Sequence, residues 1–158
     1  MNTLSKKGNM LLAESISLRV FVKIGENPQQ IREMLLKLIP FDFEKEKIAL
    51  KPKRTMGFNQ EEITIFDLKL KKKKHTSIFL DLLKNHLSSE SKNQLIETLE
   101  KRLDDECNFF VRLNKSKLLY NDQYELTTEG DCFHIKIDIA VFPKRKDNAI
   151  KEIQEFFT

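Results

Sequence analysis

The chain has 158 residues, of which 33% are charged and 40% are apolar, with 28 Lys and Arg against 24 Asp and Glu. A chain of this length can bury a core of its own, so it needs neither disulfides nor a structural metal for stability. Its two cysteines exclude the disulfide framework of a small secreted protein, and no apolar run approaches the about 20 residues that span a bilayer. We therefore expect a cytoplasmic protein with no membrane segment.

The first part of the chain predicts a tail, a strand and a helix. Residues 1–12 are polar and lack periodicity, which is typical of a flexible N-terminal tail. Residues 15–23 alternate apolar and polar side chains and indicate a strand. A helix follows, because Asn27 is a good capping residue and Pro28 suits the first helical position. Pro40 then ends this helix.

Two strands and two helices are predicted in the middle of the chain. Residues 43–56 indicate a weak strand, because Pro52 interrupts it. Residues 63–70 indicate a second strand whose apolar side chains change parity, which a bulge or burial on both faces would explain. The helical spacing of apolar residues then predicts helices over 78–87 and 95–103.

The last third of the chain predicts three strands and a final helix. Residues 109–113 indicate a short strand, and residues 124–127 and 133–141 indicate a hairpin around the turn at 129–131. Apolar spacing predicts a helix over 149–157. The order favours an α+β fold with two layers, in which helices pack on one face of a mixed or mostly antiparallel sheet. We expect residues 13–158 to form one such domain.

The cations are segregated along the chain. Residues 44–74 contain ten Lys and Arg against five acids, residues 90–106 contain three against six, and residues 121–131 contain none against four. A basic face directed at a polyanion requires segregation of this kind.

Three cation-rich segments are candidate phosphate contacts. One lies where a strand meets a helix, and each of the others follows a strand. Arg offers a planar fork to phosphate and Lys a mobile point charge. If the two strands share a sheet, the second and third segments would build one basic surface; the alternative is an ordinary solvated surface. The candidate residues are Lys71, Lys72, Lys73, Lys74, Arg112, Lys115, Lys117, Lys144, Arg145 and Lys146.

No catalytic or metal site is predicted. Cys132 and His134 share one face of a strand, but a metal would need more ligands, and Cys107 is the other cysteine. The acids at 104–106 are interpreted as a helix end or as ion-pair partners rather than as ligands of a divalent metal. Four glycines form no phosphate-binding loop and no dinucleotide fingerprint. We therefore expect no enzyme, no cofactor and no metal.

Aromatic side chains give a weak signal. The chain has no Trp, and a base-stacking platform is not established by its Phe and Tyr residues. Phe110 and Phe142 are interpreted as covering the second face of the sheet.

A series of short motifs runs over most of the chain from about Ser15 onward. They are Arg102-Leu103-Asp104, Arg112-Leu113-Asn114-Lys115, Leu126-Thr127 with Asp131, Pro143-Lys144-Arg145, Ala149-Ile150 and Gly57-Phe58-Asn59. These motifs resemble those of an archaeal family described as RNA-binding or as a predicted exosome-associated subunit. Two positions depart from that family. It usually has Asp where this chain has Asn114, and its Gly-Asn-Pro strand entry becomes Gly57-Phe58-Asn59-Gln60.

The resemblance implies a compact fold similar to the ribosomal-protein-L-five-like fold, and binding of structured RNA without catalysis. Together with the segregated charge, it leads to the hypothesis of a non-catalytic RNA-binding protein in RNA processing or ribosome-related assembly. Its partners would be RNA and an RNA-processing complex or ribosomal particle. The alternative is a protein-interaction module or homodimer that does not bind RNA, which apolar residues such as Phe21 on the sheet would favour.

Overall fold

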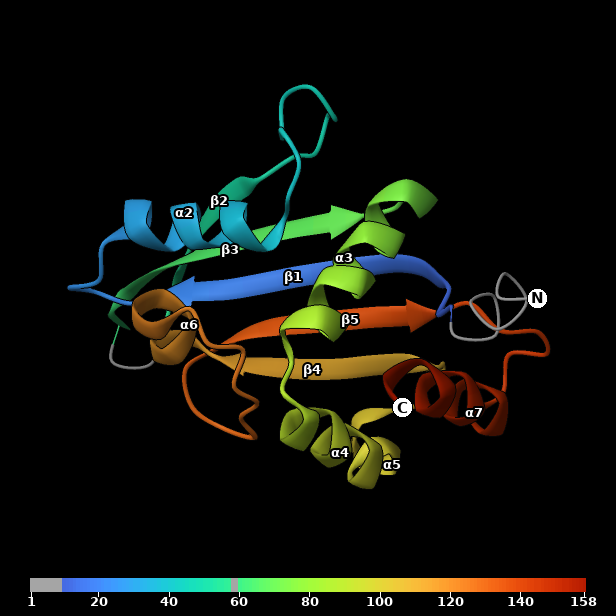
Figure 1. Cartoon of the computed structure of the whole chain (residues 1–158). Helices are drawn as coiled ribbons and strands as arrows, with labels where there is room; N and C mark the ends of the chain where they lie inside the picture. The colour runs from blue at the N-terminus through green and yellow to red at the C-terminus, as the bar shows by residue number, and fades with distance from the viewer. Residues whose placement is uncertain (1–9, 58–59) are drawn as a thin grey trace. The chain divides into compact units, whose positions relative to one another are not determined.

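The computed structural model describes residues 10–57 and 60–158 of the chain (Figure 1). Within them, five strands form an antiparallel sheet of order β2-β3-β1-β5-β4, which confirms the expected α+β fold. The strands are β1 (Ala13–Val22), β2 (Lys51–Met56), β3 (Glu62–Leu70), β4 (Asn108–Asn114) and β5 (Cys132–Ile139). The helices are α2 (Pro28–Leu38), α3 (Lys73–His86), α4 (Ser89–Glu97), α5 (Leu99–Arg102), α6 (Lys115–Asn121) and α7 (Lys146–Phe157). Of the helices described, none is long and apolar enough to cross a membrane.

The chain separates into two compact units. Unit 1 contains the described residues up to Ile16, with Lys71–Phe110 and Lys136–Thr158. Unit 2 contains Ser17–Leu70 and Val111–Ile135. The single domain expected over residues 13–158 stays a prediction.

Residues 10–12 belong to the segment that was expected to be a flexible tail, most of which lies outside the described residues. Here the chain is packed: the Leu11 side chain is buried, and the Leu12 carbonyl accepts a hydrogen bond of 2.9 Å from the Ala140 amide. The Gly57-Phe58-Asn59 motif also falls partly outside the described residues, which stop at Gly57 and resume at Gln60.

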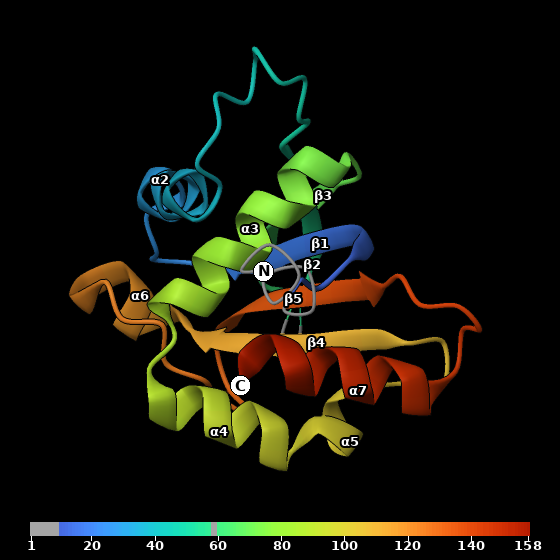
Figure 2. The ribbon, with the colours of Figure 1, turned by 45° about the vertical axis from the view of Figure 1, so that its right-hand side comes forward.

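Period-two alternation gives the strands one buried face. In β1 the side chains of Ile16, Leu18, Val20 and Val22 are buried, and those between them are half-buried or exposed. In unit 1, α3 and α7 lie on one face of the sheet (Figures 1 and 2). The Phe109 ring of β4 meets the Phe157 ring of α7 there, with centroids 6.4 Å apart. Each fully buried side chain of this size stabilises the fold by about 1.5–3 kcal/mol.

The predicted helix after Asn27 is confirmed as α2 of unit 2. The Asn27 side chain accepts a hydrogen bond of 3.0 Å from the Gln29 amide and so caps the helix, with Pro28 as its first residue. The buried side chains of α2 face the core, and α2 lies beside α6.

Pro52 is compatible with β2 because this strand lies at the edge of the sheet. A proline in an edge strand need not break a ladder hydrogen bond, since one side of the strand has no neighbour. The strand begins only at Lys51, so residues 43–50 of the expected segment are not part of it. The parity change expected along β3 is present: Phe66 and Leu68 are buried, whereas Ile63 and Ile65 are half-buried on the other face.

The hairpin predicted between residues 124–127 and 133–141 is wrong. Leu126 forms an isolated bridge with Leu113 of β4 instead. The Thr127 amide donates to the Arg112 carbonyl at 3.0 Å, and the Asn114 amide donates to the Glu125 carbonyl at 2.8 Å. The sequence pattern identified an extended segment but could not select its partner strand.

The acids at 104–106 close the turn that leads into β4. The Asp104 carboxylate accepts hydrogen bonds from the Asn108 amide at 2.9 Å, the Asn108 side chain at 3.1 Å and the Glu106 amide at 3.0 Å. Burial raises the pKa of Asp104, but the hydrogen bonds from Asn108 and Glu106 outweigh it, so the net pKa is lowered. This carboxylate therefore has a structural role.

Asp104→Ala is expected to lower the free energy of unfolding by about 1–2 kcal/mol at neutral pH, because it leaves the Asn108 amide without an acceptor. A carboxyl whose folded pKa is depressed stabilises the fold fully above its unfolded pKa and loses that contribution as pH falls through the folded value. The gap between the urea midpoints of wild type and variant should therefore narrow below the ordinary Asp pKa of 3.8. Equal gaps at neutral and acidic pH would show that ionisation of Asp104 does not contribute.

Candidate functional site

The four consecutive lysines lie at the start of α3 in unit 1. Lys71 and Lys72 link β3 to the helix, Lys73 and Lys74 are its first residues, and all four side chains are exposed. No side chain caps this end of the helix. Within the part of the chain that the structure describes, Lys71, Lys72 and Lys73 form no ion pair. Because the amino end of a helix carries partial positive charge, cations placed there favour an anionic partner.

The second cation segment follows β5, also in unit 1. Lys144 donates to the Asp138 and Glu14 carboxylates at 2.7 Å each, and these two hydrogen bonds raise the pKa of Lys144. Arg145 pairs with Asp147 at 3.2 Å. Lys146 is the first residue of α7 and forms no ion pair with any described residue.

Both cation segments belong to unit 1. Each follows a strand that neighbours β1, since the strand order in the sheet is β3-β1-β5 (Figure 1). We call residues 71–74 together with residues 142–146 the basic end of unit 1.

Residues 10–12 connect the two parts of the basic end. Met10 and Leu11 line a pocket with Ser77 and Leu80 of α3. On the other side, Leu12 is hydrogen-bonded to Ala140, just before residues 142–146. Residues 10–12 therefore link both parts of the basic end through packed or hydrogen-bonded contacts.

The basic end carries an excess of positive charge. It has seven cations, of which Lys144 pairs with Glu14 and Asp138, and Arg145 pairs with Asp147. Lys144 and Arg145 are held by these acids, whereas Lys71, Lys72, Lys73 and Lys146 are not. Lys71, Lys72 and Lys73 are exposed and Lys146 is half-buried, so these cations are in contact with solvent and available to an external polyanion.

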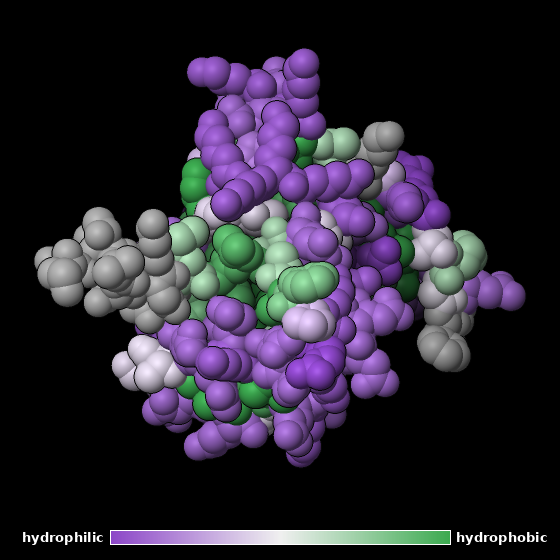
Figure 3. Space-filling model, turned by 90° about the vertical axis from the view of Figure 1, so that its right-hand side faces the viewer, coloured by the Kyte–Doolittle hydropathy of each residue, from purple (hydrophilic) through white to green (hydrophobic). Residues whose placement is uncertain are grey.

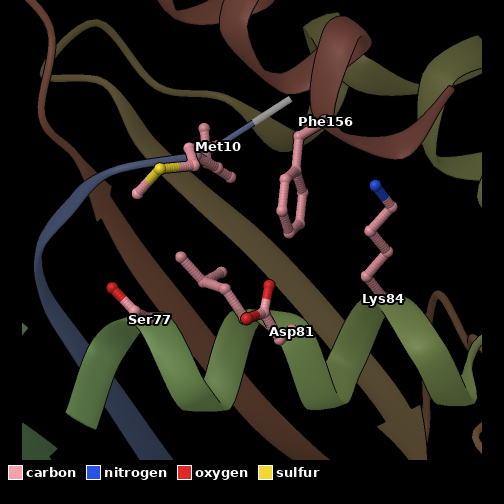
Figure 4. Close-up of a pocket in the computed structure, with 7 residues that line it drawn as sticks. Met10, Ser77, Asp81, Lys84 and Phe156 are labelled. Carbon is pink, nitrogen blue, oxygen red and sulfur yellow. The ribbon is translucent and has the colours of Figure 1, made fainter. Parts of the chain in front are cut away.

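The pocket beside the basic end is mainly apolar (Figure 4). It has a volume of about 400 Å³, and its charged lining residues are Asp81 and Lys84 of α3. The Lys84 ammonium lies 4.9 Å from the centre of the Phe156 ring, which is a cation–π distance. Among the described residues that line it, the pocket has one charge of each sign but no nucleophile paired with a base.

Apolar side chains reach the surface of unit 1, and Met10 of the pocket is one of them. Met10 is 47% exposed, Leu12 is 41% exposed and Phe142 is 97% exposed. Figure 3 shows apolar side chains at the surface, surrounded by hydrophilic ones. Phe142 was expected to cover the second face of the sheet, and the structure corrects this expectation, because its ring contacts solvent.

Arg112 and Lys117 lie in unit 2. Both are exposed; the Arg112 guanidinium is 3.5 Å from the Thr128 carbonyl oxygen, and the Lys117 ammonium is 4.0 Å from the Glu125 carboxylate. Because Lys144, Arg145 and Lys146 belong to unit 1, the expectation that both segments build one surface stays a prediction.

Lys115 is inside unit 2, where only 2% of its side chain is exposed. Its ammonium donates to the Phe21 carbonyl at 2.5 Å, the Glu26 carboxylate at 2.8 Å and the Asp131 carboxylate at 3.0 Å. All three of its protons therefore have acceptors, and it cannot reach a phosphate outside. The prediction that Lys115 contacts phosphate is therefore corrected: Lys115 has a structural role.

A signal for the burial of Lys115 was present in the sequence. Phe109, Val111 and Leu113 are buried residues of β4, and Lys115, the first residue of α6, comes two residues after Leu113 and so continues their period of two. Its charge predicted a surface position, whereas its place in this period predicted burial. The sequence pattern did not connect Lys115 with its acceptors Glu26 and Asp131.

Cys132 and His134 do not form an activated pair. The Cys132 sulfur is 3.5 Å from the His134 Nε2, and the His134 ring meets the Phe21 ring edge-on at 5.8 Å. Burial raises the pKa of Cys132, and burial with Arg112 and Arg19 lowers that of His134. A nucleophilic cysteine needs the opposite shift, towards thiolate. Among the described residues, no three His, Cys, Asp or Glu side chains are grouped to hold a metal.

The model of a protein family described as RNA binding matches residues 15–140. The chain belongs to this family. It is 27% identical over 146 residues to RNA-binding protein PAB1135 of Pyrococcus abyssi, covering 92% of this chain and 94% of the relative. It is 28% identical over 146 residues to uncharacterized protein MJ0213 of Methanocaldococcus jannaschii, covering 90% and 95%.

Solved structures share the fold of this chain. Protein AF2318 of Archaeoglobus fulgidus superposes with a TM-score of 0.79 at 21% identity, covering 91% of this chain and 99% of that one. Mth689 of Methanothermobacter thermautotrophicus superposes with a TM-score of 0.77 at 22% identity, covering 93% of this chain and 99% of that one. Both are described as DUF54 proteins.

Proposed function

We propose that this chain is a non-catalytic RNA-binding protein that contacts RNA phosphates through the basic end of unit 1. Membership of a family described as RNA binding supports the class of partner. The observation that carries the proposal is that Lys71, Lys72, Lys73 and Lys146, all in unit 1, form no ion pair with any described residue.

These cations would bind RNA by neutralising backbone phosphates and releasing condensed counterions. Lysine ammonium groups on flexible stems follow a backbone of variable geometry, so they confer affinity and orientation but not sequence preference. Lys144 and Arg145 would contribute less, since each already has a carboxylate partner. Arg112 and Lys117 of unit 2 are proposed as further contacts.

Finer assignments rest on the motif resemblance. It supports a role in RNA processing, including association with an exosome-like complex, or in ribosome-related assembly in the cytoplasm. It also supports structured RNA as the ligand and kinship with the ribosomal-protein-L-five-like fold. The RNA and the protein complex that copurify with the tagged protein would decide between RNA processing and ribosome-related assembly.

Binding of a labelled hairpin RNA should weaken by roughly a hundredfold between about 50 and 200 mM salt, if four phosphates are neutralised with a slope near −0.9 each. Fluorescence anisotropy at four or more salt concentrations gives this slope. An uncharged oligomer with the same bases, such as a peptide nucleic acid, is the control and should bind with no comparable slope. RNA binding that is weak and insensitive to salt would exclude the proposed phosphate contacts.

A further inference from the structure

Phe142 is an aromatic side chain with no packing role in the described structure. It is 97% exposed, compared with 69% for Tyr120 on α6. Burying a Phe side chain is favourable by about 1.5–3 kcal/mol, so a ring held in water forgoes that stabilisation. A single exposed apolar side chain is common on protein surfaces, so the surroundings of the ring decide whether it marks an interaction site.

The backbone that carries Phe142 is held in place. The Pro143 carbonyl accepts hydrogen bonds from the Arg145 amide at 2.9 Å and from the Asn148 side chain at 2.8 Å. Lys144 is fixed by its two carboxylate partners on β1 and β5. The segment from Pro143 to Asn148 is therefore ordered by its own contacts. The exposed Phe142 ring is attached to this fixed backbone. A platform that is ordered before binding loses less entropy when a ligand docks on it.

The surroundings of Phe142 match a nucleic acid better than a protein. Lys146 lies four residues after it and has no ion pair with any described residue, and Lys71–Lys74 belong to the same unit. Protein interfaces are depleted of lysine around their apolar centre, whereas sites for single-stranded nucleic acid combine an aromatic ring with flanking cations. The ring supplies a flat apolar face, and the cations complement the charge of the backbone.

We infer that Phe142 is a stacking platform for an unpaired base of the bound RNA, with neighbouring phosphates on Lys71–Lys73 and Lys146. This inference rests on the proposed function and names the ligand more narrowly: RNA that presents at least one unstacked base, as in a loop, bulge or single strand. A base inside a duplex is already stacked on its neighbours and is not free to dock on the ring. Every base has a π-face, so this contact favours unpaired RNA without selecting a sequence.

The test compares Phe142→Ala with Tyr120→Ala, a matched loss of an exposed aromatic ring in unit 2. Each variant is titrated with two labelled RNAs of equal length: a hairpin with an unpaired loop, and a blunt duplex. Phe142→Ala should weaken hairpin binding by about tenfold, the effect of losing one stacked base, and leave duplex binding unchanged. Tyr120→Ala should change neither. Because the Phe142 ring is exposed, its removal should leave the urea midpoint unchanged.

A second measurement reports on the ring directly. The chain has no Trp, so Phe142→Trp introduces a single indole. Its fluorescence should be quenched by the hairpin but not by the duplex, and hairpin affinity should equal or exceed that of wild type. Phe142→Leu, which keeps an apolar side chain without a ring, should behave like Phe142→Ala.

The outcomes separate this inference from the proposed function. If wild-type protein binds neither RNA, both are overturned. If wild type binds hairpin and duplex, and Phe142→Ala binds both equally well, the proposed function stands and the stacking role is overturned. A change in molar mass by light scattering in Phe142→Ala, with hairpin binding unchanged, would assign the ring to contact between protein copies and would likewise overturn the stacking role.

Discussion

Lys115→Met is expected to lower the free energy of unfolding by about 3 kcal/mol, because it leaves the Glu26 carboxylate and the Phe21 carbonyl without their cation and leaves Asp131 with Lys23 at 3.5 Å. The ammonium donates to the Glu26 and Asp131 carboxylates, which retain 30% and 26% side-chain exposure. Partial solvation of these acids keeps the expected cost at the lower end for a broken buried pair. Urea denaturation followed by circular dichroism measures the change.

The control for this variant is Lys117→Met, two residues further along α6. The Lys117 side chain is 46% exposed, and its nearest carboxylate is 4.0 Å away. An exposed pair of this kind contributes less than about 1 kcal/mol, so the midpoint should hardly move. Adding Glu26→Gln and Asp131→Asn to Lys115→Met should recover part of the loss by removing the uncompensated charges. Equal midpoints for Lys115→Met and Lys117→Met would contradict the structural role of Lys115.

Neutralising three lysines of the basic end is expected to reduce RNA affinity by about a hundredfold at roughly 0.1 M salt. The variant is Lys71→Gln/Lys72→Gln/Lys73→Gln. Each lost phosphate contact should also reduce the magnitude of the salt slope by about 0.9, which gives about 2.7 for the three. Because these side chains are exposed and unpaired, the fold should tolerate the change. Anisotropy titrations of the hairpin at several salt concentrations measure both quantities.

The matched control removes the same charge from elsewhere in unit 1, as Lys92→Gln/Lys101→Gln/Lys151→Gln on α4, α5 and α7. Net charge is equal in the two triple variants, so a general electrostatic attraction would weaken both alike. Only a localised interface makes the first variant bind much more weakly than the second. Equal losses of RNA affinity in the two triple variants would show that the basic end is not the RNA contact.

The sequence alone predicted most of the elements of this fold. Asn27 and Pro28 defined the start of α2, and alternation along β1 separated its buried face from the open one. These features depend on neighbours one to four residues apart, so local chemistry is enough to specify them. The lysine run at Lys71 was likewise identified as a cluster at the start of a helix, and the structure places it there.

What the sequence could not determine was which distant segments meet. It paired residues 124–127 with β5, whereas Leu126 bridges to β4. It also grouped the cations after β4 with those after β5, and this grouping stays a prediction because the two segments belong to different units. Strand order depends on contacts between residues far apart in the chain, and a period of two does not encode them.

Sequence and tertiary structure therefore determined different properties of this protein. The residues themselves specified the α+β class, the cation-rich segments and the likeness to an RNA-binding family. Only the folded chain decided which of these side chains are buried or paired and which are exposed to water. Lys115 is enclosed by three oxygens, Lys144 is held by two carboxylates, and Phe142 is left in water. The physical reason is that desolvation and pairing decide whether a side chain supports the fold or is available to a ligand.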